Sequence, residues 1–368
     1  MQSRRQFINT AVLGTVAGAT ETSFACNAGE DQKRHSSDGT ATYPPKPQTG
    51  RLHDLWSSEV KDLVLLPVPA LSDGEKERHT LYSVLLMALV AHYWNGNKNG
   101  LDGDYPWRAK QKRPDGQYLG GDYLGHNIAC LAVDGQGEVI DFDFNHNNLL
   151  NSSVEHAESR LIRRIFSLTQ LYDGWAVRKP PTDQKPRPYS TILDQVTVYT
   201  SLESCSQCSG IMALGSVKEV VYLQRDPGQS SIGNILRNLS AQGGASFAAP
   251  LPVPADAFSL ECFGELEKGY SEFSKEVTSK PFHIDRDGKK DTSASITSFL
   301  CTDRALEVFK EGQRRVVGLQ VKFPGFKPKT PDGKDDSRVL SNQEVVDHIQ
   351  RFFAYATRDG RRGTPHKL

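Results

Sequence analysis

Residues 196–223, VTVYTSLESCSQCSGIMALGSVKEVVYL, contain the pattern that decides the fold. The β-branched run at 196–201 predicts a buried strand, and KEVVYLQ at 218–224 predicts a second strand. Between them, Ser204 and Gln207 have the spacing of a helix-capping box, which predicts a short helix over 205–214. A strand, a helix and a strand in this order are typical of a layered α/β domain.

The residues upstream extend this pattern. An S-x-x-E capping box and the amphipathic run that follows it predict a helix over 72–94. Alternating apolar residues on both sides of the turn DGQG predict a β-hairpin over 127–144. Apolar residues at helical spacing predict a further helix over 154–171, with Ser153 as its N-cap. This order of elements predicts a mixed sheet with helices packed on it.

The carboxyl-terminal third has a weaker pattern. Capped helices are predicted over 302–312 and 341–358, and RRVVGLQVKF at 314–323 between them has the composition of a strand. We expect an α-rich extension here, without deciding from the pattern whether it is a separate domain.

The composition is that of an ordinary globular protein. The chain has 368 residues, of which 37% are hydrophobic, so it can bury a substantial core. Lysine plus arginine and aspartate plus glutamate number 44 each, which excludes a global basic field for nucleic acid or membranes. The longest apolar run in the body, residues 84–91, is far shorter than the roughly 18 residues of a membrane span. The mature chain is therefore not expected to be an integral membrane protein.

The amino terminus has the features of a targeting segment. Residues 3–8, S-R-R-Q-F-I, and the mildly apolar stretch after them resemble a twin-arginine export signal. We expect a signal over 1–26, a disordered linker over 27–55 and a periplasmic location. Lipid attachment at Cys26 is not expected, because the residues before it do not fit the attachment pattern.

This expectation has a direct test. Replacement of Arg4 and Arg5 by lysine should retain the protein inside the cell, as measured by fractionation of the cell compartments. Normal export of that variant would contradict the twin-arginine route.

Three residues predict a metal site. Cys205 and Cys208 lie one helical turn apart at a predicted helix start, where the positive helix end favours thiolates. His156, at the start of another predicted helix, supplies a third ligand, and three protein ligands leave a fourth position open, as in catalytic zinc sites. Glu158 is the candidate proton carrier. A thiol–disulfide pair at Cys205 and Cys208 is the alternative, although it leaves His156 and Glu158 without a role.

The pattern His156-x-Glu158 followed by Cys205-x-x-Cys208 resembles the signature of the zinc-dependent cytidine/deoxycytidylate deaminase-like superfamily. Residues 196–227 are most similar to the branch of tRNA adenosine deaminases and guanine deaminases, and the resemblance covers about 75–235. It implies a cytidine deaminase-like three-layer α/β/α fold with a mixed sheet. It also implies hydrolytic deamination of a nucleobase, in which zinc hydroxide attacks the amidine carbon and ammonia is released.

The resemblance also suggests substrate contacts. Asn145 stands where this branch places an asparagine that hydrogen-bonds the substrate, with a hairpin turn residue as the alternative. His126, at the mouth of the hairpin, is a second candidate, with a surface histidine as the alternative. Aromatic and basic residues at 94–123 would suit a nucleotide or a single-stranded nucleic acid, or would pack within their own domain.

Two departures from the family pattern affect the interpretation. Ser204 stands where the family has proline, and residues after 235 match poorly. We predict a deaminase-like zinc domain over 56–270 and an extension over 271–368. The expected substrate contains a nucleobase. The sequence is compatible with a homo-oligomer and does not decide the oligomeric state. A thiol–disulfide protein and a non-catalytic deaminase-fold binding protein remain the alternative functions.

Overall fold

A computed structural model describes the following residues: 59–65, 71–96, 100–101, 125–150, 152–168, 192–229, 231–241, 249–281, 283–284, 290–292, 294–330 and 333–358. All of them belong to one unit, Pro47–Leu368. The predicted export signal, the linker with Cys26, and most of the aromatic and basic residues at 94–123 lie outside the described residues.

A five-stranded mixed sheet forms the centre of this unit, with the order β3-β2-β4-β5-β6. The predicted hairpin is confirmed as the antiparallel pair of β2 and β3, and β2 also pairs antiparallel with β4. The two strands of the opening sequence stretch are confirmed as β4 and β5, which run parallel, as do β5 and β6. The strands are β2 (Ala129–Val133), β3 (Val139–Phe144), β4 (Thr197–Thr200), β5 (Glu219–Tyr222) and β6 (Leu251–Pro254).

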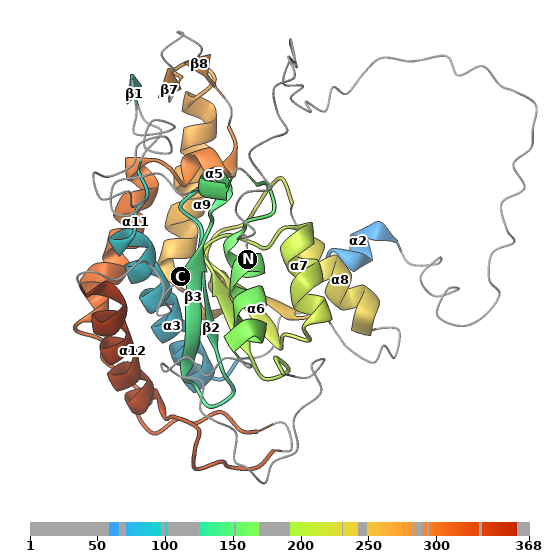
Figure 1. The fold of residues 1–368 in the computed structure, drawn as a ribbon, viewed down its shortest axis with the longest axis vertical. Coiled ribbons are helices and arrows are strands. Elements are labelled where there is room, and N and C mark those ends of the chain that lie inside the picture. Colours follow the sequence, from blue (N-terminus) through green and yellow to red (C-terminus); the bar gives the residue numbers. More distant parts are fainter. Residues whose placement is uncertain are drawn as a thin grey trace, which may run out of the picture. The chain divides into compact units, whose positions relative to one another are not determined.

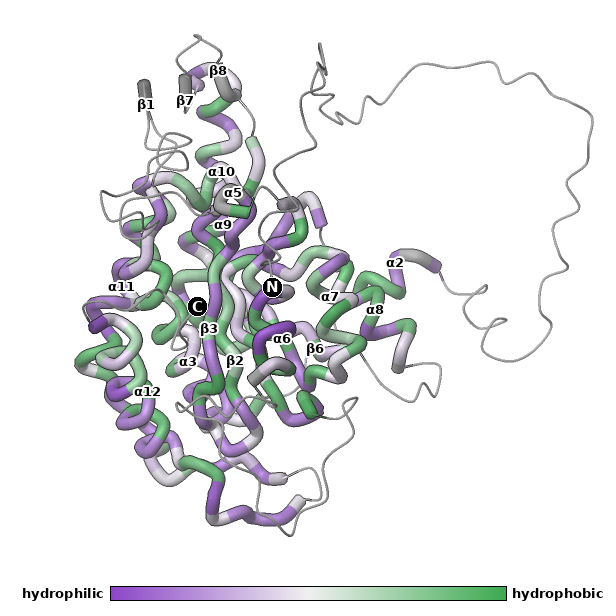
Figure 2. Tube along the Cα trace, viewed as in Figure 1, coloured by the Kyte–Doolittle hydropathy of each residue, from purple (hydrophilic) through white to green (hydrophobic). Residues whose placement is uncertain are grey.

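Helices cover both faces of the sheet, which confirms the three-layer α/β/α prediction (Figure 1). One face packs against α6 (Ala157–Leu168), which lies beside α7 (Ser206–Leu214), and α7 contacts α8 (Ile232–Ala241). The other face packs against α3 (Asp73–His92), and α3 is itself covered by α11 (Asp303–Val316) and α12 (Asn342–Thr357). In Figure 2 polar and apolar positions alternate along α12, as expected for a helix with one buried side.

The second half of α3 is apolar on nearly all sides because it lies between the sheet and the carboxyl-terminal helices. Every residue from Leu81 to Val90 is buried. Its start is fixed by the predicted capping box, in which Ser72 and Glu75 bond each other's backbone nitrogens. Gly312 of α11 packs directly on this helix, because a Cβ there would come within 2.3 Å of Met87. The close approach of α11 to α3 therefore requires a residue without a side chain.

The strand-like interpretation of residues 314–323 is wrong. Arg314–Val316 form the last turn of α11, and no strand follows them among the described residues. The apolar side chains Phe309 and Val316 are buried on one helical face together with Gly312, so the helical period continues into this segment. Helices begin where expected at Thr302 and Ser341, and Ser341 forms the predicted capping box with Glu344.

The fifth strand, β6, has the sequence LPVP and has no clear strand signal. Pro252 and Pro254 are tolerated because β6 is an edge strand, where a missing backbone donor costs no ladder bond on the outer side. The predicted boundary between residues 270 and 271 lies within α9 (Glu261–Glu276), and the division into domains stays a prediction. No helix in the described part of the chain has the length and apolar character needed to cross a bilayer.

Short elements complete the described chain. They are α2 (Val60–Leu63), α5 (Asn147–Leu150), the 3-10 helix η4 (Ala255–Phe258), α10 (Ile296–Phe299), and a small sheet of β1 (Gly100–Leu101), β7 (His283–Ile284) and β8 (Lys290–Asp291).

Candidate metal centre

Three predicted ligands meet where α6 and α7 begin, beyond the carboxyl end of β4. The Nδ1 atom of His156 lies 3.4 Å from Sγ of Cys205 and 3.6 Å from Sγ of Cys208. One nitrogen and two sulfur atoms thus lie within 4.8 Å of one another. Cys208 is buried, while His156 and Cys205 are partly exposed, so one side of the cluster remains accessible.

The spacing of these atoms fits zinc. In a tetrahedral site with ordinary zinc bond lengths, an imidazole nitrogen and a thiolate sulfur lie roughly 3.5 Å apart. The two observed nitrogen–sulfur distances, 3.4 and 3.6 Å, bracket this value without any rearrangement. Imidazole and thiolate are also the ligand types that zinc prefers. The centre therefore fits a zinc ion held by three protein ligands, with one position left for another group.

Asn145 explains how His156 reaches this position. The helix α6 begins at Ala157, so His156 precedes it and is free of the helical register. The Oδ1 atom of Asn145 accepts a hydrogen bond of 2.7 Å from the backbone nitrogen of Ala157. Asn145 thereby caps α6 from the end of β3, in place of the predicted cap Ser153. This also resolves the spacing of His156 and Glu158, which would not share a face within a regular helix.

Glu158 lies in the first turn of α6 beside the cluster and is only 4% exposed. Its Oε1 atom accepts hydrogen bonds from the hydroxyls of Thr200 at 3.1 Å and Ser204 at 3.3 Å. Its Oε2 atom lies 3.4 Å from Sγ of Cys208, which donates to it. Burial, and then the nearby charge of Cys205, raise the pKa of this carboxyl group above its ordinary value. The carboxylate is therefore held in one orientation next to the ligands.

The role predicted for Ser204 at the helix start is wrong. The N-cap of α7 is Cys205, and it makes no side-chain capping bond. Gln207 does not complete a capping box either, because its amide donates to the carbonyl of Val154 and to Oγ of Ser159. Ser204 instead donates to Glu158, a contact that the proline of the family pattern could not make.

The two cysteines are not equivalent. The hydrogen bond from Cys208, and further that from His156, lower the pKa of the Cys205 thiol to about 4. The pKa of Cys208 is raised, because its hydrogen bond to Cys205 and its burial both favour the protonated form. The pair therefore holds a proton on Cys208 in preference to Cys205. Binding of a divalent cation would release this proton.

A set of buried ion pairs fixes α6 on the sheet. Asp141 and Asp143 alternate with phenylalanines along β3, so both carboxylates face α6 and are fully buried. Arg164 pairs with both of them, at 2.7 Å from Asp143, and also donates to the carbonyl of Phe142. Arg160 lies 3.3 Å from Asp143 and 2.8 Å from Glu155. These pairs hold the helix whose first turn carries Glu158.

The two substrate-contact candidates lie near this centre but are placed differently. Asn145 is buried and uses Oδ1 on Ala157, while its amide nitrogen makes no hydrogen bond within the described part of the chain. His126 is partly exposed just before β2, and the segment beside it packs on the backbone of Asn145.

The sequence analysis did not single out two further groups at the centre. Thr200 appears only as a β-branched strand residue, yet its hydroxyl bonds Glu158. Glu203 is buried and accepts backbone bonds from Asp226 at 3.1 Å and Ser231 at 2.8 Å, which fixes the loop after β5 beside α7. Asp226 lies close enough for its charge to interact with Cys205 and His156. A signal for Glu203 was available in its position two residues before the first cysteine.

Comparison with known proteins agrees with this geometry. Residues 116–224 match the family model of the cytidine and deoxycytidylate deaminase zinc-binding region. The match spans less than a third of the chain and includes the three ligands and Glu158. This chain therefore contains a zinc-binding region of the cytidine and deoxycytidylate deaminase type. No curated protein matches the chain significantly.

Two solved structures match part of this chain. One comes from work on A-to-I editing by tRNA:A34 deaminases at the wobble position of transfer RNA, with 20% identity over 35% of this chain and 82% of that chain, and a TM-score of 0.24. The other is NE0047 in complex with 2,6-diaminopurine, with 20% identity over 36% of this chain and 67% of that chain, and a TM-score of 0.24.

Proposed function

We propose that this protein is a zinc-dependent hydrolase that removes the exocyclic amino group of a nucleobase and releases ammonia. The observation that carries the proposal is the position of Glu158, buried and oriented by two hydroxyls immediately beside a three-ligand zinc centre with one open position. A structural zinc site needs neither the open position nor the carboxylate.

The reaction replaces a carbon–nitrogen bond by a carbon–oxygen bond. When bound, zinc would lower the pKa of a water molecule in the open position to about 7. In this scheme Glu158 accepts a proton from the attacking water and delivers it to the departing amino nitrogen, which leaves as ammonia. Thr200 and Ser204 hold the carboxylate in place during both transfers, because both hydroxyls donate to the same oxygen, Oε1. The second oxygen, Oε2, faces Cys208 and the centre.

We assign Asn145 to orientation of the ring of the base. Its Oδ1 atom is committed to the start of α6, so the amide nitrogen is the group left to donate to a ring acceptor. His126 is the second proposed contact, from the segment that precedes β2. The base itself can be free, part of a nucleoside, or part of a single-stranded nucleic acid.

A substrate panel tests the proposed function. Zinc-loaded protein is incubated with free bases, nucleosides and single-stranded oligonucleotides that contain adenine, guanine or cytosine, and ammonia is measured. We expect release from at least one substrate class, and we expect Cys205→Ser to lose both zinc and activity. Zinc binding without ammonia release from any class would favour a non-catalytic binding protein. A chain that binds no zinc but exchanges disulfides would favour the thiol–disulfide alternative.

A further inference from the structure

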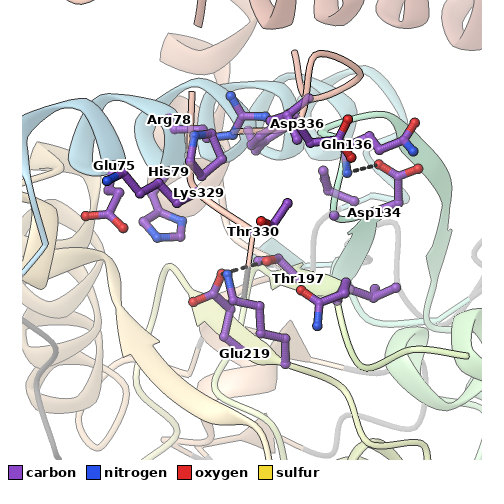
Figure 3. A pocket seen from close by; sticks show the side chains of 18 of the residues that line it. Glu75, Arg78, His79, Asp134, Gln136, Thr197, Glu219, Lys329, Thr330 and Asp336 are labelled. Carbon is purple, nitrogen blue, oxygen red and sulfur yellow. Dashed lines mark hydrogen bonds and ion pairs between the residues drawn. The ribbon is translucent and has the colours of Figure 1, made fainter. Parts of the chain in front are cut away.

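A cavity of about 400 Å³ lies at the end of the strands opposite to the metal centre. Figure 3 shows it between α3, the β2–β3 turn, the starts of β4 and β5, and residues 324–330 and 333–341 before α12. We call these residues the C-terminal arm. The cavity is on the α3 side of the sheet, since Tyr199 lines it and packs with α3. It is therefore separated from the zinc site by the sheet itself.

The C-terminal arm is fixed over the cavity at both ends. The backbone nitrogen of Leu340 donates to the carbonyl of Gln136 in the β2–β3 turn at 2.8 Å. The carbonyl of Leu340 in turn accepts from the guanidinium of Arg78 on α3 at 2.8 Å. At the other end, Glu77 of α3 accepts a bond of 3.0 Å from the backbone nitrogen of Phe323, next to the arm. These hydrogen bonds hold the C-terminal arm in place as one wall of the cavity.

Two buried polar side chains face one another across the inner part of the cavity (Figure 3). Glu219, 8% exposed, accepts bonds at Oε1 from Thr197 at 2.6 Å and Lys218 at 3.3 Å. Its Oε2 atom has no hydrogen bond within the described residues. His79, 7% exposed, bonds Tyr199 through Nδ1 at 3.0 Å, and its Nε2 atom likewise has no partner in that part of the chain.

The charge states of these two groups follow from their surroundings. Burial lowers the pKa of His79, and the nearby carboxylate of Glu219 opposes this shift. Burial raises the pKa of Glu219, but His79, Lys218 and Thr197 together outweigh it and hold the value below the ordinary one. The inner part of the cavity thus has an ionised carboxylate with one oxygen unbonded. A buried anion with spare acceptor capacity favours a ligand that donates and carries positive charge.

The outer part of the cavity has a positively charged side chain. Lys329 reaches it from the C-terminal arm and forms no ion pair with any described residue, whereas its neighbours Asp336 and Arg338 neutralise each other at 2.7 Å. In Figure 3 Lys329 lies across the cavity from Glu219. One unsatisfied anionic oxygen and one unpaired ammonium group therefore lie on opposite walls.

We propose that this cavity binds a small zwitterion, whose ammonium or amidinium group contacts Glu219 and whose carboxylate or phosphate group contacts Lys329. The volume is within the range of small-molecule sites, and the ligand would complete the bonds that Glu219 and His79 lack. Because the sheet separates the cavity from the zinc centre, this inference does not rest on the proposed deaminase activity.

Calorimetric titration with L-arginine as the probe tests the proposal. We expect saturable binding of L-arginine, and weaker binding of agmatine, which lacks the carboxylate, and of L-citrulline, which lacks the guanidinium charge. Glu219→Gln and Lys329→Ala should each weaken L-arginine binding by about tenfold or more, because each removes one charge-assisted contact.

Lys327→Ala is the matched control. Lys327 lies on the same C-terminal arm, pairs with Glu344 at 3.6 Å and does not line the cavity, so its replacement should leave binding unchanged. Lys329 is exposed, so its variant is expected to fold even if Glu219→Gln does not. The proposal is overturned if the parent protein shows no saturable binding of L-arginine. It is equally overturned if Lys329→Ala binds as the parent does, or if agmatine and citrulline bind as well as arginine.

Discussion

Glu158→Gln should lower kcat on any substrate of this protein by about 10²–10⁴-fold, the usual contribution of a positioned proton carrier. Glutamine has nearly the same size and can keep the hydrogen bonds from Thr200 and Ser204 at its carbonyl oxygen, so the site should keep its shape. Only the ability to take up and release a proton is lost. Steady-state kinetics of ammonia release measure the effect.

Zinc content and thermal midpoint provide the control for this variant. Glu158 is not among the three converging ligands, so the purified Glu158→Gln protein should hold the same zinc stoichiometry as the parent. Loss of zinc would mean that the carboxylate holds the metal site together. Full turnover with zinc retained would remove Glu158 from the mechanism, and with it the observation on which the proposed function depends.

Asp143→Ala should lower the free energy of unfolding by about 3 kcal/mol, because removal of one partner leaves buried positive charge uncompensated. Asp143 is fully buried, and Arg160 and Arg164 are only 12% and 16% exposed, so solvent screens these pairs poorly. Since the affected helix carries Glu158 in its first turn, zinc affinity should fall as well. Urea unfolding, with and without a chelator, measures both effects.

Glu307→Ala is the comparison for that variant. Glu307 pairs with Lys310 one turn along α11, and both side chains are exposed, so the pair should contribute nothing measurable to the urea midpoint. An Asp143→Ala protein as stable as the parent would show that Asp141 and Glu155 are sufficient partners for Arg164 and Arg160. The interpretation of β3 as the anchor of α6 would then be wrong.

The sequence predicted the central part of the fold well because local and tertiary preferences agree there. The capping boxes at Ser72 and Ser341 form as expected, and the β-branched strands of the opening stretch lie at the centre of the sheet. The failures occur where burial comes from distant partners. Residues 314–317 have the composition of a strand but form the last turn and C-cap of α11. Nothing in the local sequence shows that Gly312 of α11 packs against α3. The edge strand β6 pairs only with β5, and its two prolines remove the sequence pattern by which a strand is predicted.

The sequence predicted which residues form the candidate site better than it predicted the contacts that position them. The H-x-E and C-x-x-C spacings correctly predict which three side chains come together, because zinc binds few types of ligand. The supporting contacts are long-range and have no local signal. Asn145 caps α6 from another element, and Ser204 bonds Glu158 instead of beginning its own helix. Such contacts depend on the relative placement of α6 and β4, which only the folded chain defines.

The position of α3 affects how the protein can be shortened for experiments. The stretch 116–224 that matches the deaminase zinc-binding region contains β2 to β5 but not α3, which packs on β2 and β4. A fragment cut to that stretch would expose the apolar side chains that now contact α3, and a fragment that keeps α3 but ends before α11 would expose α3 itself. The smallest soluble version should therefore extend from about residue 71 to the end of α12, so the family signature alone is a poor guide for cloning.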